Sequence, residues 1–163
     1  ITKCPCPVLT MSQFVETLGY HKIVMALDMS EHSRHKVPAT IDLAKQFSAQ
    51  IYVIGVLTSD EESKKPSMEV MLKQVEQAAA KAGLICKSEL KTNVKNRAVE
   101  TVNYCKAVEG DLITIMTDQD AELSGFFIGN YALQVIHHSK VPVLSFKPQD
   151  HPENVNFSIL AGT

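Results

Sequence analysis

Lys22-Ile-Val-Met-Ala-Leu27, followed directly by Asp28-Met-Ser-Glu-His-Ser33, is the stretch of this 163-residue chain that decides its fold. The first half is a short apolar run, as expected for a strand that is buried on both faces. The second half supplies turn residues, acidic groups and N-cap side chains, which predict the start of a helix. Apolar residues then recur at helical spacing as far as Phe47, and we expect Pro38 to kink this helix. The stretch therefore reads as one strand-to-helix step.

The same step repeats along the chain. Polar residues without apolar periodicity fill 58–66, including Glu61 and Lys64, so a solvated loop is expected there. Ser67 is expected to cap a long helix that ends at Gly83. Strands that alternate with helices indicate a parallel sheet with helices on both faces, an open α/β fold. Further strands are predicted at 51–57, 84–90, 111–116 and 141–146, and further helices from about 97 to 110 and from 125 to 140.

The first eleven residues repeat the last predicted strand. Residues 1–11 align without a gap with residues 136–146, and both segments contain Pro-Val-Leu. The offset between them is the length of a domain, not of a solenoid repeat. We therefore expect a piece of a longer tandem protein, although Pro-Val-Leu also recurs in strands by chance. On this interpretation, residues 1–20 are the closing strand of a preceding domain plus a linker, 21–147 are one domain, and 148–163 are a tail.

Composition excludes several classes of protein. Apolar residues make up 45% of the chain, enough for one core, and the net charge of −2 gives no basic surface for nucleic acid. No apolar run approaches the roughly 18–20 residues of a membrane span. Four cysteines are too few for a disulfide framework, so reduced thiols and a cytoplasmic location are expected. The pairs His32/His35 and His137/His138 have no third ligand nearby, so no metal site is predicted.

Four segments in order resemble the universal stress protein family: Lys22–Ser33, Asp111–Met116, Gly129–Ile136 and Val141–Leu144. The resemblance covers 21–146. It implies a Rossmann-like, adenine nucleotide alpha hydrolase-like domain with a five-stranded parallel sheet in the order 3-2-1-4-5. It also implies that two domains, in one chain or in a homodimer, pair through their last strands.

In the ATP-binding branch of the family, the resemblance implies a loop of the form Gly-x2-Gly-x9-Gly-Ser/Thr after the fourth strand. Bare glycines there let backbone amides approach phosphates at a helix N-terminus. This chain has Met116 and Gln119 at the first two glycine positions and Asn130 at the hydroxyl position. Asp118 and Asp120 add negative charge. We therefore expect no ATP in the standard site.

A degenerate nucleotide crevice is nevertheless expected where the strands end. Its candidate residues are Asp28, which matches the adenosine-side carboxylate of ATP-binding members, and Val56, Gly129 and Asn130. No motif specifies a nucleophile, a base and an orienting group together, so no catalytic residue is predicted. The favoured function is a non-catalytic stress-response module that acts through dimer or tandem-domain association. The alternative is an ATP- or ADP-binding module, or a weak ATPase, with a non-standard phosphate loop.

The N-terminal segment has to find the edge of a sheet, because its apolar residues would otherwise stay in water. We expect it to pair antiparallel with the last strand, as family members pair these strands. Proline lacks an amide donor, so Pro7 and Pro142 should keep the ladder short. The predicted interface residues are Val8, Thr10, Val141, Val143 and Ser145.

Overall fold

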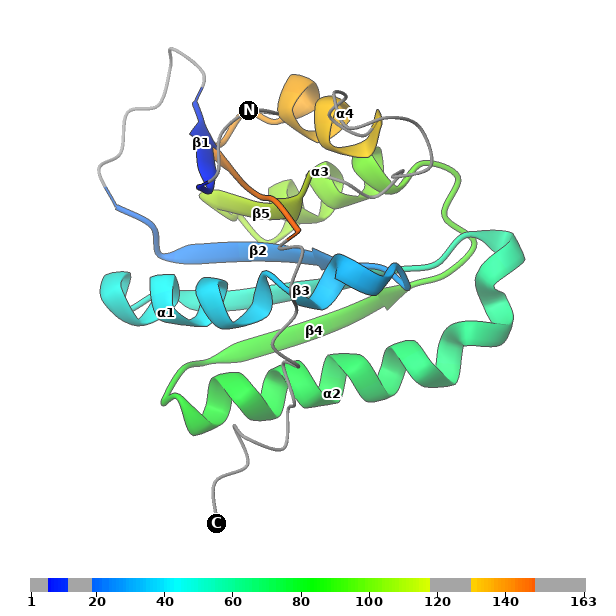
Figure 1. The fold of residues 1–163 in the computed structure, drawn as a ribbon, viewed down its shortest axis with the longest axis horizontal. Coiled ribbons are helices and arrows are strands. Elements are labelled where there is room, and N and C mark those ends of the chain that lie inside the picture. Colours follow the sequence, from blue (N-terminus) through cyan, green and yellow to red (C-terminus); the bar gives the residue numbers. More distant parts are fainter. Residues whose placement is uncertain (1–5, 12–18, 118–129, 149–163) are drawn as a thin grey trace.

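One sheet organises the molecule, with helices against both of its faces (Figure 1). The computed structural model describes residues 6–11, 19–117 and 130–148. The order of the strands is β1-β6-β5-β2-β3-β4, and every neighbouring pair is parallel except β1 with β6. The strands are β1 (Val8–Thr10), β2 (Lys22–Leu27), β3 (Gln50–Val56), β4 (Cys86–Lys91), β5 (Leu112–Met116) and β6 (Val143–Phe146).

The predicted five-stranded sheet is wrong in its strand count and in its full order, because β1 adds a sixth strand outside β6. The five parallel strands alone are neighbours in the order β4-β3-β2-β5-β6. Figure 1 shows β1 in blue beside β6 in orange, although they lie at opposite ends of the sequence. The antiparallel pairing predicted for the N-terminal segment is confirmed. Its register pairs Val8 with Ser145, Leu9 with Leu144, and Thr10 with Val143.

The helices begin where proline is tolerated. Pro38 lies in the first turn of its helix and does not kink it, so that prediction is wrong. A proline in the first turn removes no hydrogen bond, because the amides there have no partner within the helix. Pro66 has the same position, and the second helix begins two residues before the predicted cap at Ser67. The α-helices in the described residues are α1 (Val37–Phe47), α2 (Lys65–Lys81), α3 (Arg97–Ala107) and α4 (Asn130–His138).

The segment predicted to be a solvated loop is a helix instead. Ser59–Lys64 forms a 3-10 helix, η2, and a shorter one, η1, spans Glu31–Arg34. Thr58 and Glu61 form a capping box at the start of η2. Glu61 is only 9% exposed, so this carboxylate belongs to the interior and not to a solvated surface.

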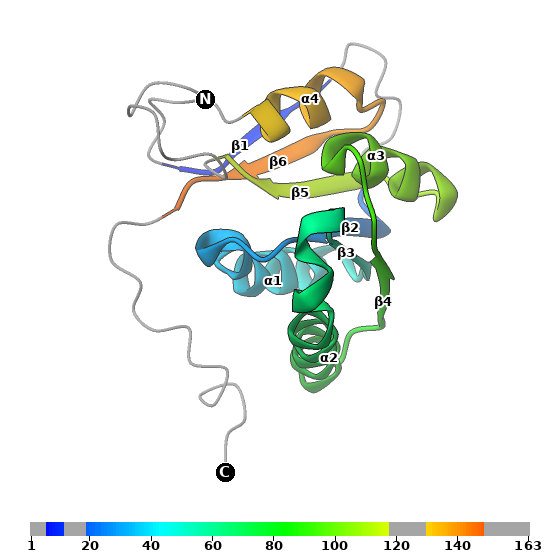
Figure 2. The ribbon, with the colours of Figure 1, turned by 90° about the vertical axis from the view of Figure 1, so that its right-hand side faces the viewer.

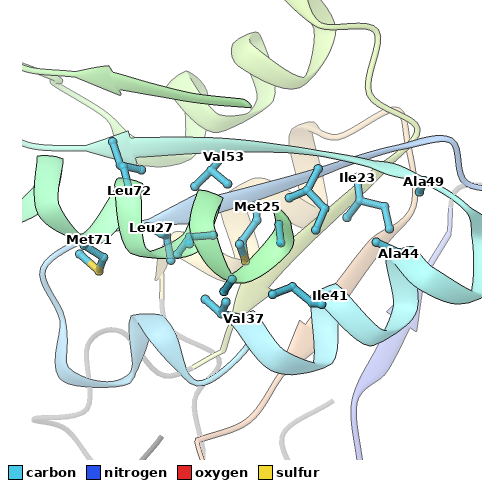
Figure 3. Close-up of a cluster of buried hydrophobic side chains, with 14 of the residues drawn as sticks. Ile23, Met25, Leu27, Val37, Ile41, Ala44, Ala49, Val53, Met71 and Leu72 are labelled. Carbon is cyan, nitrogen blue, oxygen red and sulfur yellow. The ribbon is translucent and has the colours of Figure 1, made fainter. Parts of the chain in front are cut away.

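Two apolar layers fix the helices to the sheet. Ile23, Met25 and Leu27 of β2 point to the face covered by α1 and α2, and Figure 3 shows them packed against Val37, Ile41 and Leu72 among others. Alternate residues of the same strand, Val24 and Ala26, point to the face covered by α3 and α4. Figure 2 shows these two helix pairs on opposite sides of the sheet. Both faces of the sheet are covered by helices, and in sheets of this kind ligands bind at the carboxyl ends of the central strands.

Candidate functional site

Asp28 follows β2 directly and is only 2% exposed. Its Oδ1 atom accepts hydrogen bonds from the Ser30 amide at 3.0 Å and from the Ser30 hydroxyl at 2.6 Å. The Asp28 amide donates to the Ser33 hydroxyl at 2.9 Å. The predicted turn after the first strand is therefore formed around this carboxylate, and one of its oxygens is already satisfied within the turn.

Arg97, the first residue of α3, approaches the other oxygen. Its Nη1 atom lies 3.8 Å from Asp28 Oδ2, and its Nη2 atom donates a hydrogen bond to Glu61 Oε2. The guanidinium thus joins the end of β2, the 3-10 helix η2 and the start of α3. We call these three residues the Asp28–Arg97–Glu61 cluster.

The cluster keeps Glu61 ionised. Burial by itself would raise the pKa of this carboxyl group, but hydrogen bonds from Arg97 and from the backbone and side chain of Thr58 outweigh it and lower the pKa to about 2. Lys64 adds a second cation, with its Nζ atom 3.4 Å from Glu61 Oε1. Glu61 therefore carries its charge at every physiological pH, and Arg97 is its principal partner.

Lys36, which immediately precedes α1, is a second cation whose charge interacts with that of Asp28. Its side chain is completely buried, and Nζ donates to the Ser33 carbonyl at 2.7 Å. Burial lowers the pKa of Lys36 to about 8, and the negative charge of Asp28 opposes that shift. Asp28 therefore lies in the fields of two cations, Lys36 and Arg97.

An open cleft of 420 Å³ lies on the other side of Arg97, between η2, α3 and α4. Its polar wall is an amide chain in which Asn96 donates to Gln134 at 2.8 Å and Gln134 donates to Asn130 at 2.9 Å. Asn96 also caps α3, because its Oδ1 atom accepts from two backbone amides. The cleft is lined by Thr58, Asp60, Lys95, Asn96, Arg97, Ala98, Asn130, Tyr131 and Gln134.

The predicted site residues are only partly brought together. Asp28 joins the cluster and Asn130 lines the cleft, but Val56 is 1% exposed and packs in the core. Gly129 lies outside the described residues, as do Gln119, Asp118 and Asp120. Sequence reasoning missed Arg97 and Glu61. The capping-box pattern of Thr58 and Glu61, three residues apart, was the one local signal that could have indicated an ordered carboxylate there.

Four of the five predicted interface residues pair in the ladder between β1 and β6, and Val141 does not. Val8 and Thr10 pair with Ser145 and Val143, respectively. Val141 precedes β6, contacts the apolar layer beneath α4, and exchanges hydrogen bonds with the Ser139 hydroxyl. Within the described residues, no group of three or more His, Cys, Asp or Glu side chains could hold a metal ion. No helix there is both long enough and apolar enough to cross a membrane.

A mostly parallel sheet with helices on both faces and a polar crevice at the carboxyl ends of its strands defines a doubly wound α/β domain. Residues 19–147 match the model of the universal stress protein family, so the chain belongs to that family.

Relatives agree with this assignment. Universal stress protein MJ0531 of Methanocaldococcus jannaschii is 28% identical in an alignment 142 residues long, which covers 78% of this chain and 82% of that protein. A putative universal stress protein structure from Pseudomonas aeruginosa UCBPP-PA14 is similar in fold, with a TM-score of 0.68 and 21% identity over 98% of this chain and 56% of that one. A universal stress protein in complex with cAMP has a TM-score of 0.63 and 18% identity, over 79% of this chain and 98% of that one.

Proposed function

We propose that this domain is a non-catalytic stress-response module that acts by associating with a second universal stress protein domain along the edge of β6. The observation that carries the proposal is the register between β1 and β6. Leu9 pairs with Leu144, and these two residues are also equivalent in the internal repeat. A residue that pairs with its own equivalent lies on a two-fold axis.

The neighbouring pairs obey the same symmetry. Val8 is equivalent to Val143 in the repeat and pairs with Ser145, whereas Thr10 is equivalent to Ser145 and pairs with Val143. Two copies of β6 would form the same ladder, centred on Leu144 of each copy. The edge is thus self-complementary, as an isologous interface requires. β1 takes the place that a second β6 would otherwise fill.

Main-chain groups form the antiparallel ladder between β1 and β6. With β1 in place, Val143 is 1% exposed and Ser145 is 2% exposed. The Thr10 hydroxyl adds a hydrogen bond to the Val143 carbonyl at 3.1 Å. This chain covers 56% of the Pseudomonas aeruginosa structure, so that chain is long enough to hold a second domain of this size.

The test is the mass of a truncated chain in solution. Without residues 1–11, β6 becomes an open edge, and we expect a symmetric dimer in sedimentation velocity and light scattering. The full chain should remain monomeric under the same conditions. A chain without residues 1–5 is the matched control, because it keeps β1. A truncated chain that stays monomeric with unchanged stability would contradict the proposal.

Nucleotide binding is the second candidate function. It is supported by the open cleft, which includes Lys95 and Asn130, and by the related structure that holds cAMP. Calorimetry with Mg-ATP, ADP and cAMP, together with an assay for released phosphate, separates the two candidates. Binding at micromolar concentrations would favour the nucleotide module, and phosphate release would make it an ATPase. No binding at millimolar concentrations would favour the association module.

A further inference from the structure

We propose that Arg97 is a specificity-determining residue, which acts as an internal ligand of Asp28 and so prevents the crevice from accepting the adenosine end of a nucleotide. The proposal concerns a different part of the molecule from the β6 edge and does not depend on association there. It names a single side chain as the cause of exclusion, separately from the altered phosphate loop.

Both carboxylate oxygens of Asp28 face other groups of the protein. Oδ1 is occupied by the amide and the hydroxyl of Ser30, and Oδ2 faces the guanidinium of Arg97. A ribose or base that contacts Asp28 has to use one of its two oxygens as the acceptor, because an ionised carboxylate cannot donate. Only Oδ2 has no hydrogen bond, and it is completely buried. A ligand can therefore reach this carboxylate only by moving Arg97.

The position of Arg97 relative to the cleft differs from that of Asp28. Arg97 lines the cleft and its side chain is 29% exposed, whereas Asp28 is 2% exposed and is not part of the cleft wall. The guanidinium thus stands between the space that a ligand could enter and the carboxylate that it would have to contact.

Displacement of Arg97 is resisted by its other partner. The Nη2–Glu61 hydrogen bond fixes the far side of the guanidinium, and Asn96 fixes the first turn of α3, where Arg97 begins the helix. A ligand that moved Arg97 would leave Glu61, 9% exposed, without its principal cation. Charge-assisted hydrogen bonds of this kind are among the strong ones in proteins, and an unpaired buried charge is costly.

Removal of the Arg97 guanidinium should leave the Asp28 carboxylate ionised and make it accessible from the cleft. Lys36 is completely buried and its charge interacts with that of Asp28, so a positive charge still acts on Asp28 when Arg97 is absent. An Arg97→Met chain retains an apolar stem of similar length, and Asp28 gains a free oxygen toward the cleft.

Adenosine is the probe that isolates this end of the crevice, because it has no phosphates and so does not involve the altered loop. Calorimetry and two-dimensional NMR are carried out on the full wild-type chain, Arg97→Met and the control Lys106→Met. Lys106 is an exposed lysine in the last turn of the same helix and belongs neither to the cleft wall nor to the cluster. We expect no adenosine binding up to several millimolar for the wild type and Lys106→Met. Arg97→Met should bind at least about tenfold more tightly, with shifts at the Asp28 and Ser30 amides.

Three results would overturn the proposal: adenosine binding by the wild type as tight as by Arg97→Met, no binding by either, or an equal gain in Lys106→Met. Should Arg97→Met not fold, Arg97→Lys replaces it, because a lysine is a compact point charge that cannot bridge both carboxylates as the guanidinium fork does. A gain with Arg97→Lys supports the proposal, and no gain overturns it. The oligomeric state of the truncated chain does not depend on adenosine binding, so either proposal can be contradicted without the other.

Discussion

The β6 edge and the Asp28–Arg97–Glu61 cluster satisfy their polar groups in opposite ways. The edge leaves a row of main-chain groups that only another strand can pair, and β1 supplies that strand from far away in the sequence. The cluster instead pairs its charged side chains with one another across three elements. The comparison shows that the main-chain groups of the β6 edge need another strand as a partner. The charged side chains of the cluster already pair with one another and leave few groups for a ligand.

The largest expected effect comes from placing a charge on the symmetry axis. In the chain without residues 1–11, Leu144→Lys sets two lysines directly opposite each other in the predicted dimer. Like charges facing each other across strands are unfavourable, so dimerisation should weaken by about 100-fold or more. Sedimentation equilibrium measures the change. Leu144→Met is the control and should leave the dimer intact. An undiminished dimer in Leu144→Lys would show that the axis lies elsewhere, and an equal loss in both variants would show that repulsion between charges on the axis is not the cause.

Lys36 gives the next effect, and it should appear only at alkaline pH. The native state loses this proton near pH 8, whereas the unfolded chain keeps it until about pH 10.5, so the unfolded state binds more protons in between. Stability should therefore rise with pH across that window, by up to about 3 kcal/mol at about 1.36 kcal/mol per pKa unit. Urea unfolding at pH 7 and pH 10 measures the rise.

The matched variant is Lys36→Met, which should lack the rise and be more stable than the wild type at pH 7, because no buried ammonium is left. Replacement of buried charges by apolar residues of similar volume is often neutral or stabilising. Equal pH dependence in both chains would show that Lys36 is not the group that titrates.

Arg97→Met should cost about 2 kcal/mol of unfolding free energy at pH 7, because it leaves two buried carboxylates without their shared cation. Urea denaturation measures it. Lys106→Met, in the exposed last turn of the same helix, should stay within about 0.5 kcal/mol of the wild type. Similar losses in both variants would mean that net charge, not the cluster, determines the stability.

Glu61→Gln should have the smallest effect, about 1 kcal/mol at neutral pH. The pKa of Glu61 is about 2 in the folded chain and 4.5 in its ordinary range, so its stabilisation is fully present above pH 4.5 and is lost as the pH falls toward 2. The wild type and Glu61→Gln should therefore converge in stability on acidification. Thermal unfolding followed from pH 6 to pH 2.5 tests this, and a constant gap between the two curves would disprove it.

The sheet could be predicted because each step of it is local. Apolar runs flanked by caps and turns identify β2, β3 and β5 directly, and the repeat of Pro-Val-Leu indicated where β1 would pair. Errors arose where one residue type serves two purposes. Pro38 was expected to break a helix, but in a first turn the same rigid ring starts one.

The cluster could not be predicted, because its members lie on separate elements. Asp28, Glu61 and Arg97 are each ordinary where they stand: a turn residue, one of a run of charges, and a polar residue at the start of a helix. Only the packing of η2 and α3 beside β2 buries them together. A run of charges predicts solvation on average, and here one member of the run is folded inward.

The pairing of β1 with β6 also has a consequence for synthesis on the ribosome. Thr10 and Val143 are separated by 133 positions, so β1 is translated long before the strand that it pairs with. At about 5–20 residues per second, β1 waits roughly 7–27 s for β6 to appear. β1 therefore lacks β6 as a partner while these positions are added. That strand is only three residues long and follows Pro7, which makes it a poor template for pairing with neighbouring nascent chains during the wait.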